Sequence, residues 1–170
     1  MNLKRFKRPA VLALFLVVAI IVFGLLLINN MSNLSPYEYL WKTESDDRIA
    51  PSELLYQETL NTGVSLVFYI SQRGKYECVL MSKTIYGYKI LGHSGSLDTD
   101  NAGINLYGSF TNGDEKTDIC WGILVDESIQ KVFLDGEPCS IVDTAYKGLR
   151  IFWMVGCWED PPLLTTNKFS

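Results

Sequence analysis

Hydrophobic residues follow two patterns along this chain, one continuous and one alternating. The continuous run covers residues 11–28, VLALFLVVAIIVFGLLLI, and contains no polar side chain. A helix of this length spans about 27 Å, close to the thickness of the hydrocarbon core of a bilayer. Fifteen of its positions are Leu, Ile, Val or Phe, which favours insertion into lipid by a total on the order of 5 to 9 kcal/mol. The pattern therefore predicts a transmembrane helix that holds residues 11–28 in the lipid bilayer.

Charged residues beside this segment predict its orientation. Lys4, Arg5, Lys7 and Arg8 precede the apolar run, whereas residues 29–39 contain no Lys or Arg. Basic residues next to a span stay on the cytoplasmic side of the membrane. We therefore expect residues 1–10 to form a cytoplasmic stub and the rest of the chain to be extracytoplasmic, as in a single-pass protein of the cell membrane.

A cleaved export signal is the alternative to a permanent anchor. Such a signal has an apolar core of about 7 to 15 residues and a small-x-small cleavage site. Residues 27–31 read LINNM and lack that site. A lipid-attachment cysteine does not follow the apolar run either, since the first cysteine is Cys78. The sequence thus favours an uncleaved signal-anchor.

Residues 29–52 are expected to form a spacer that contains one short helix. Residues 29–34 are mostly polar, and Ser35 can then act as an N-cap, with Pro36 at the first helical position. Glu38 completes a capping-box arrangement three residues after the cap. Helical spacing then aligns Tyr37, Leu40 and Trp41.

From residue 53 onward the hydrophobic period changes to two, which is typical of β-strands. Short glycine-containing loops separate the segments, and Asp135-Gly136 is a dipeptide typical of a two-residue hairpin turn. We expect strands over residues 54–60, 64–71, 75–83, 86–92, 104–111, 118–125, 129–134, 138–143 and 149–155. No helical pattern interrupts them, so the fold class is mainly β. An antiparallel β-sandwich or barrel-like domain is expected over residues 53–157, followed by a loose tail over 158–170.

The apolar content of each segment predicts its place in a sheet. Residues 66–70 and 151–155 are apolar on both faces and should be central, whereas residues 75–83 are mixed and should lie nearer an edge. The polar stretch 93–103 is interpreted as a loop between two halves of the domain. A simple meander in the second half would bring Cys120, Cys139 and Cys157 toward one end of the sheet, where a disulfide is geometrically plausible.

Four cysteines occur after the apolar run: Cys78, Cys120, Cys139 and Cys157. An extracytoplasmic compartment permits their oxidation, and four cysteines allow three connectivities among which the sequence does not choose. Buried free thiols are the other interpretation, because cysteine is among the most buried residue types. No C-x-x-C pair is present, so neither a zinc ribbon nor a thioredoxin-like motif is indicated.

The charge of the exported part limits its partners. Fifteen basic residues stand against 19 acidic ones in the whole chain, and four of the basic residues precede the span, which leaves the exported part at about −8. Nucleic acid and anionic lipid headgroups should therefore be repelled on average, and no nucleic-acid partner is expected. Net charge of this size also favours solubility, and it says nothing about the fold.

The segment around His93, the only histidine, offers the densest set of chemically active residues. Ser94, Ser96, Asp98 and Asp100 follow it, which suggests a hydrolase. A nucleophile elbow, however, needs G-x-S-x-G at a strand-to-helix turn, and GHSGS does not match that pattern. We therefore expect a solvated turn here and name no catalytic residue.

A calcium-loop pattern begins at Asp98 in the same segment. Asp100 and Gly103 occupy its third and sixth positions, but Ala102 and Ser109 stand where an oxygen ligand and a bidentate carboxylate are required. No metal or other cofactor is therefore predicted.

Paired carboxylates and aromatic residues are the remaining candidates. Asp46 and Asp47, and Asp114 and Glu115, lie in segments that look exposed, so solvated turns explain them better than acid-base chemistry. The aromatic residues of the strands are expected to pack in the core rather than to form a glycan platform. They are Tyr69, Tyr76, Tyr86, Tyr88, Tyr107, Trp121, Phe152 and Trp153. Trp158, beyond the last expected strand, is the best candidate for exposure.

The order of a basic anchor, a Ser-Pro helix and the strand segments LVFYIS, ICWGILVD, IQKVFLDGE and LRIFWMV resembles small membrane-anchored or lipid-anchored exported proteins of Gram-positive spore-forming bacteria. The resemblance covers most of residues 35–155 and implies an envelope location and a β fold. That group has no assigned activity, so no functional residue is carried over.

Three hypotheses for function follow. The first is a non-enzymatic envelope module whose β domain binds a protein or cell-wall partner outside the membrane. The second is an envelope hydrolase that uses the His93 segment. The third is a sensor that responds to redox conditions through paired cysteines.

Overall fold

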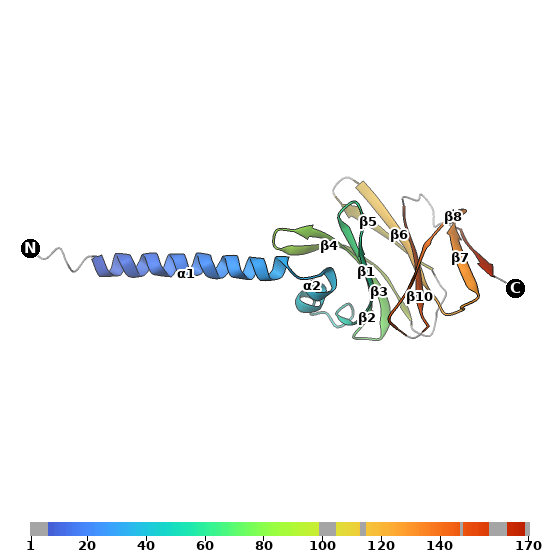
Figure 1. Cartoon of the computed structure of the whole chain (residues 1–170), viewed down its shortest axis with the longest axis horizontal. Coiled ribbons are helices and arrows are strands. Elements are labelled where there is room, and N and C mark those ends of the chain that lie inside the picture. Colours follow the sequence, from blue (N-terminus) through green and yellow to red (C-terminus); the bar gives the residue numbers. More distant parts are fainter. Residues whose placement is uncertain (1–6, 99–104, 113–114, 147, 157–162, 169–170) are drawn as a thin grey trace, which may run out of the picture.

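The computed structural model describes residues 7–98, 105–112, 115–146, 148–156 and 163–168. A long helix, α1 (Lys7–Ser32), leads into a short helix, α2 (Pro36–Thr43), and then into antiparallel β structure. Figure 1 shows α1 projecting from one end of the molecule, with the β sheets stacked beyond its C-terminal end.

The described strands form three antiparallel sheets. Sheet A has the order β1-β2-β3-β4, sheet B the order β5-β6-β10-β9, and sheet C the order β11-β7-β8. The strands of sheet A are β1 (Pro51–Thr59), β2 (Val64–Ser71), β3 (Lys75–Thr84) and β4 (Gly87–Asp98). Those of sheet B are β5 (Asn105–Asn112), β6 (Glu115–Leu124), β9 (Ser140–Asp143) and β10 (Arg150–Gly156). Those of sheet C are β7 (Ile129–Leu134), β8 (Glu137–Pro138) and β11 (Leu164–Lys168).

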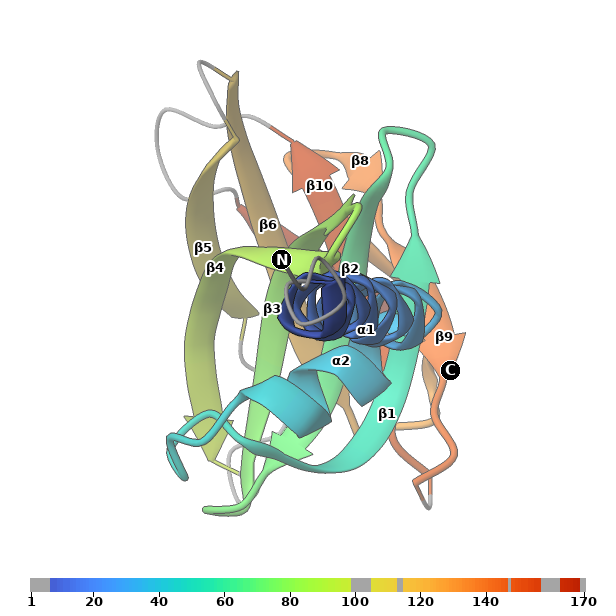
Figure 2. The same cartoon turned by 90° about the vertical axis from the view of Figure 1, so that its left-hand side faces the viewer.

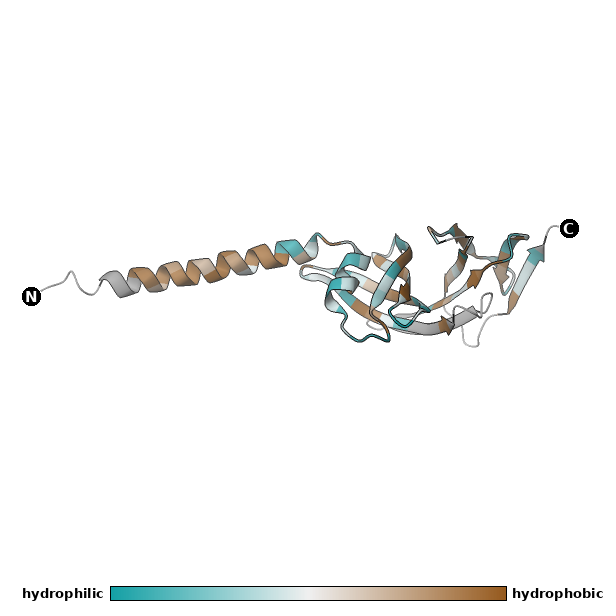
Figure 3. Cartoon of the chain, turned by 90° about the horizontal axis from the view of Figure 1, so that it is seen from below, coloured by the Kyte–Doolittle hydropathy of each residue, from teal (hydrophilic) through white to brown (hydrophobic). Residues whose placement is uncertain are grey.

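Helix α1 has the length and composition to cross a membrane. Its segment Val11–Ser32 has a mean hydropathy of 3.4, and its most apolar stretch is not buried anywhere in the molecule. Figure 3 shows hydrophobic residues along this helix up to a polar C-terminal end. The helix extends past residue 28 because residues 29–32 add another turn, so most of the expected polar spacer is helical.

The main core lies between sheets A and B, which pack face to face as a β-sandwich. Phe68 of β2 meets Trp121 of β6 edge to face, with ring centroids 5.5 Å apart, and both side chains are fully buried. Around this pair, alternate residues of β2, β3, β6 and β10 point inward. Burying an aromatic or aliphatic side chain of this kind contributes about 1.5–3 kcal/mol, so this interior stabilises the domain.

The outer face of sheet A is covered by α2. Leu40 is fully buried against Val67 of β2 and Val79 of β3. The helix begins as predicted, because the Ser35 side chain accepts a hydrogen bond from the Glu38 N–H and the Glu38 carboxylate accepts one from the Ser35 N–H. Sheet B covers one face of β2 and α2 covers the other, so all residues of this strand are buried.

The outer face of sheet B carries a smaller cluster. Phe152 of β10 is fully buried there, together with Leu124 of β6 and Val132 of β7. Strands β7 and β11 of sheet C therefore cover sheet B on the side away from sheet A.

Several expectations are confirmed. The domain is mainly β and antiparallel, and β2 and β10 are central strands of their sheets. Asp135 and Gly136 join β7 to β8 with φ angles of +51° and +85°, as a type I′ turn requires. Gly63 and Gly74 also have positive φ at the ends of the first two hairpin loops.

Other expectations are wrong. Strand β3 lies between β2 and β4 rather than near an edge, because α2 and sheet B cover its two faces. The second half is not a meander, since β10 pairs with β6 and β9 while β7 and β8 belong to sheet C. Where a loose tail was expected, Leu164–Lys168 forms β11 and pairs with β7.

The segment expected as a polar loop also differs. Strand β4 continues through His93 to Asp98 by pairing with β3 over that whole length. Two register shifts leave Gly95 and Leu91 of β4 without an opposite residue on β3. Pairing with a neighbouring strand satisfies backbone groups that the polar sequence alone would leave to solvent.

Candidate functional site

A hollow in the described surface lies at one end of sheet B. Its volume is about 330 Å³, and it is lined by Glu127, Asp143, Thr144, Gly148, Leu149 and Arg150. These residues come from the β6–β7 turn, the end of β9, the β9–β10 loop and the start of β10. We call this hollow the Arg150 pocket.

Backbone pairing fixes Arg150 within the pocket. As the first residue of β10, it pairs with Leu124 of β6 on one side and with Asp143 of β9 on the other. Its guanidinium Nη2 donates a 2.7 Å hydrogen bond to the Asp126 carbonyl. The side chain is therefore positioned by both the sheet and the β6–β7 turn.

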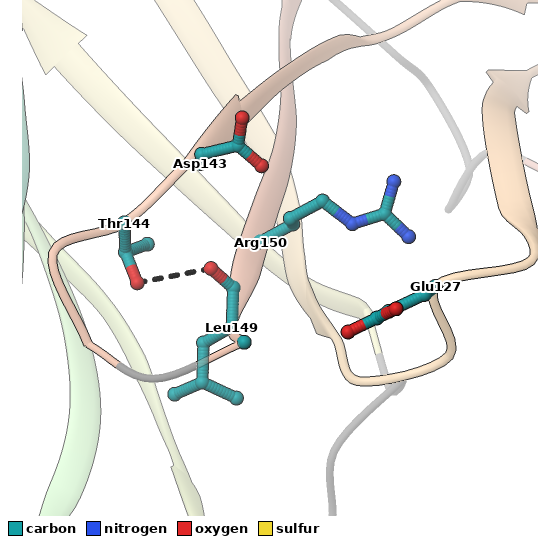
Figure 4. A pocket seen from close by; sticks show the side chains of 6 residues that line it. Glu127, Asp143, Thr144, Leu149 and Arg150 are labelled. Carbon is teal, nitrogen blue, oxygen red and sulfur yellow. Dashed lines mark hydrogen bonds between the residues drawn. The ribbon is translucent and has the colours of Figure 1, made fainter.

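The loops on either side of the pocket are held by their own hydrogen bonds. Thr144 Oγ1 donates to the Leu149 carbonyl at 3.0 Å, which closes the β9–β10 loop (Figure 4). The Asp126 carboxylate accepts from the Ser128 backbone at 3.0 Å, which orders the β6–β7 turn. The walls of the pocket are thus formed before any ligand arrives.

The Arg150 pocket contains both positively and negatively charged side chains. Figure 4 shows the carboxylates of Asp143 and Glu127 on either side of Arg150. Among the described residues, the ion pairs within 4 Å are Arg48–Asp46 and Arg73–Asp47, so neither pocket carboxylate closes onto the guanidinium. An arginine keeps several N–H donors in a planar fork. The pocket can therefore bind an anionic group at Arg150 and a cationic group at its rim.

Nothing in the sequence marks this pocket. Glu127, Asp143 and Arg150 are ordinary loop and strand-end residues with no common spacing. They meet because β6 and β9 both pair with β10. The expected meander in this half would not have produced that neighbourhood.

His93 lies on β4 rather than in a solvated loop. It pairs with Val79 of β3, and its Nδ1 atom is buried without a hydrogen-bond partner among the described residues. Burial lowers the pKa of His93, against a smaller opposing effect of Glu44. The side chains of Ser94 and Ser96 lie outside the described part, so the expected serine–histidine grouping is not described.

The remaining polar candidates form no common site. Asp46 pairs with Arg48, which lowers the pKa of Asp46 to about 2, and Asp47 pairs with Arg73. Asp100, Gly103 and Asp114 lie outside the described residues, as do Ala102 and the side chains of Asp98, Ser109 and Glu115. In the ranges the structure describes, no group of three or more His, Cys, Asp or Glu residues is placed to hold a metal ion.

The cysteines are divided between two layers. Cys78 is buried between sheets A and B, whereas Cys120 and Cys139 lie on the other side of sheet B. Cys120 lies on β6 and Cys139 lies between β8 and β9, and both are free thiols. Burial raises the pKa of each of these two thiols to about 11. After burial, the nearby Cys139 also contributes to the raised pKa of Cys120. Cys157 lies outside the described residues.

Most of the described aromatic residues belong to the core, as expected. Tyr69, Tyr76, Trp121, Phe152 and Trp153 are buried. Tyr69 also donates a 2.7 Å hydrogen bond to the Ile49 carbonyl. Burial, and after it the nearby Glu77, raise the pKa of Tyr69.

Two aromatic residues near the end of α1 are exposed, and of these Tyr86 had been expected in the core. Tyr86, in the β3–β4 turn, and Trp41, on α2, are 61% and 63% exposed. The side chain of Tyr107 and the whole of Trp158 lie outside the described part.

Comparison with known proteins adds no relative to this description. No family profile matches the chain, and no curated protein and no solved structure is significantly similar to it.

Proposed function

We propose that this protein is a single-pass membrane protein whose β domain is an extracytoplasmic binding module, with its N-terminus in the cytoplasm. The carrying observation is that the apolar stretch of α1 is exposed throughout, although it is long enough to span a bilayer. Exposed apolar surface of this extent is unstable in water and stable in lipid. The basic residues before the helix give the orientation.

Membrane insertion and orientation are tested on the full chain in its native membranes. We expect alkaline carbonate to leave the protein in the membrane pellet, and protease added outside spheroplasts to remove the β domain. Release by carbonate contradicts the anchor. Protection of the domain from protease contradicts the orientation.

The Arg150 pocket is the proposed binding site of the module. It combines a positioned guanidinium with two carboxylates that are not paired to it. A peptide end or a cell-wall peptide carries carboxylate and ammonium groups that match this arrangement. At about 330 Å³, the pocket is at the lower end of the range for small-ligand sites.

A matched pair of variants tests this site. Partners crosslinked in intact membranes are to be recovered with the wild-type chain, with Arg150→Gln and with Lys131→Gln, an exposed control on β7. We expect Arg150→Gln to lose the partner and Lys131→Gln to retain it. Equal recovery with both variants, or no partner with the wild-type chain, counts against the proposal.

The other two hypotheses have weaker structural support. The described part of the chain gives His93 no positioned nucleophile and keeps its ring half-buried. The raised pKa of Cys120 and Cys139 keeps both as unreactive thiols at neutral pH. The binding module therefore remains the preferred function.

A further inference from the structure

The β3–β4 hairpin turn has a composition that its own geometry does not require. Thr84 pairs with Gly87, so Ile85 and Tyr86 form a two-residue turn. Neither residue has a positive φ, which falls on Gly87 instead, so the backbone of the turn does not dictate which side chains they carry. Here the turn exposes 72% of an isoleucine and 61% of a tyrosine to solvent.

The position of this turn suggests why it is apolar. Helix α1 contacts β4, and Figure 1 shows the β3–β4 hairpin reaching back to the C-terminal end of α1. Viewed along α1 in Figure 2, the hairpin lies on one side of the helix and α2 on the other. The point where the chain leaves α1 is therefore flanked by both elements.

Helix α2 contributes a second exposed aromatic residue to the same end of the molecule. Leu40 faces sheet A and is fully buried, whereas Trp41 is 63% exposed. The hairpin and α2 are fixed to each other, because the Tyr39 ring packs on Gly87 and meets Tyr88 edge to face at 5.7 Å. Ile85, Tyr86 and Trp41 are therefore exposed on two elements that are fixed to each other, and we call these three residues the collar.

Charge at the collar differs from charge on the rest of the domain. Lys83 and Lys89 lie on either side of the hairpin turn, and Lys42 is exposed on α2. The acidic residue of α2 is Glu38, whose carboxylate accepts a 2.8 Å hydrogen bond from the Ser35 N–H. The exported part as a whole is strongly acidic, whereas residues 83–89 contain two lysines and no acidic residue.

We propose that the collar rests in the headgroup region of the outer leaflet, with Trp41, Ile85 and Tyr86 at the apolar boundary and the lysines near anionic lipid. Tyr and Trp are the residues that favour this depth of a bilayer. The bilayer is the partner that fits the collar, because the β3–β4 hairpin and α2 flank the C-terminal end of α1, where the chain would leave the membrane. The inference rests on the proposed anchoring of α1 and adds a fixed orientation of the domain on the membrane.

The test uses two tyrosines that differ in position but not in type. Tyr86→Trp and Tyr146→Trp each add one tryptophan at an exposed tyrosine. Tyr146 is the control, because it belongs to the β9–β10 loop of sheet B. Each full-length variant is reconstituted in vesicles of phosphatidylcholine and phosphatidylglycerol, with and without brominated acyl chains, and the emission of the parent chain is subtracted.

We expect bromine to remove most of the emission added by Tyr86→Trp and little of that added by Tyr146→Trp. Brominated lipid should also quench part of the tryptophan emission of the parent chain, and the Trp41→Phe variant should lack that quenched part. Resistance to carbonate, measured on the same vesicles, reports the anchor separately. A chain that remains inserted but shows equal, weak quenching at both positions overturns the collar and leaves the anchor intact. Release by carbonate overturns both.

Discussion

Two hairpins whose turns lie within the described residues each turn through two residues, and they differ in what those residues are. The β7–β8 turn uses Asp135 and Gly136, both with positive φ, as the geometry of such turns favours. The β3–β4 turn uses Ile85 and Tyr86 and places its positive φ, +119°, on the following Gly87. The first turn lies in sheet C, and the second lies beside the end of α1.

The difference separates local from non-local causes. In the β7–β8 turn, Gly136 is favoured by its own positive φ and not by a neighbouring side chain, since an added Cβ would meet nothing within 4 Å. In the β3–β4 hairpin, an added Cβ at Gly87 would collide with the Tyr39 ring of α2. That hairpin is therefore shaped by α2 and, in our proposal, by the membrane beyond it.

The largest effect should come from removing the contact between α2 and sheet A. Leu40→Ala leaves a cavity under α2, and we expect it to reduce the free energy of unfolding by about 3 kcal/mol. Leu163→Ala, at an exposed residue next to the β7–β8 hairpin, should change it by less than about 0.5 kcal/mol. Urea unfolding of the full chain in detergent micelles, followed by tryptophan fluorescence, measures both. Equal effects would contradict the packing role of α2.

The two glycines test the comparison most directly. Gly87→Ala combines backbone strain with a clash against Tyr39, so we expect a loss of about 2–3 kcal/mol. Gly136→Ala meets only the cost of a positive φ, about 1 kcal/mol. The same urea titrations apply. If Gly136→Ala is the more destabilising change, the β3–β4 hairpin is not locked to α2 as described.

A smaller effect is expected at the start of α2. Ser35→Ala removes the side-chain half of the capping box, which should cost about 1 kcal/mol. Ser128→Ala removes a serine hydroxyl from the exposed β6–β7 turn but keeps the backbone hydrogen bond to Asp126. We expect that control to be close to neutral. Comparable losses in the two variants would show that the cap contributes nothing specific.

The protonation of His93 should affect the free energy of unfolding only at acidic pH. Its pKa is lowered in the folded protein by burial, so the unfolded chain binds a proton first as the pH falls. The free energy of unfolding should therefore decrease as the pH drops below about 6.5, and level off once the folded imidazole is protonated as well. His93→Gln should remove that part of the pH dependence, and Leu163→Ala should keep it. A wild-type slope retained in His93→Gln contradicts this origin, because His93 is the only histidine.

The sequence allowed local features to be predicted and missed most of those that depend on pairing. The capping box at Ser35 and the Asp135-Gly136 turn were predicted correctly, because each is specified by a few consecutive residues. The continuation of β4 through His93 and the pairing of β11 were missed. Both depend on a neighbouring strand that accepts the ladder hydrogen bonds.

The candidate sites were missed for the same reason. Glu127, Asp143 and Arg150 approach one another only because β10 lies between β6 and β9. Helix α2, which carries Trp41, is fixed to the hairpin of Tyr86 only because Gly87 allows the Tyr39 ring to pack there. Neither group has a motif, a spacing or a shared composition that a linear reading can detect.

The sequence by itself determined the apolar helix, the start of α2, the strand-rich character of the domain and the tight turns. Each of these follows from the hydrophobic period or from the backbone preferences of adjacent residues. The tertiary structure alone decided that β3 is central, how β4 and β11 pair and which polar residues share a pocket. Those outcomes depend on contacts between residues distant in the chain, and the alternation of side chains in a strand does not specify which other strand it pairs with.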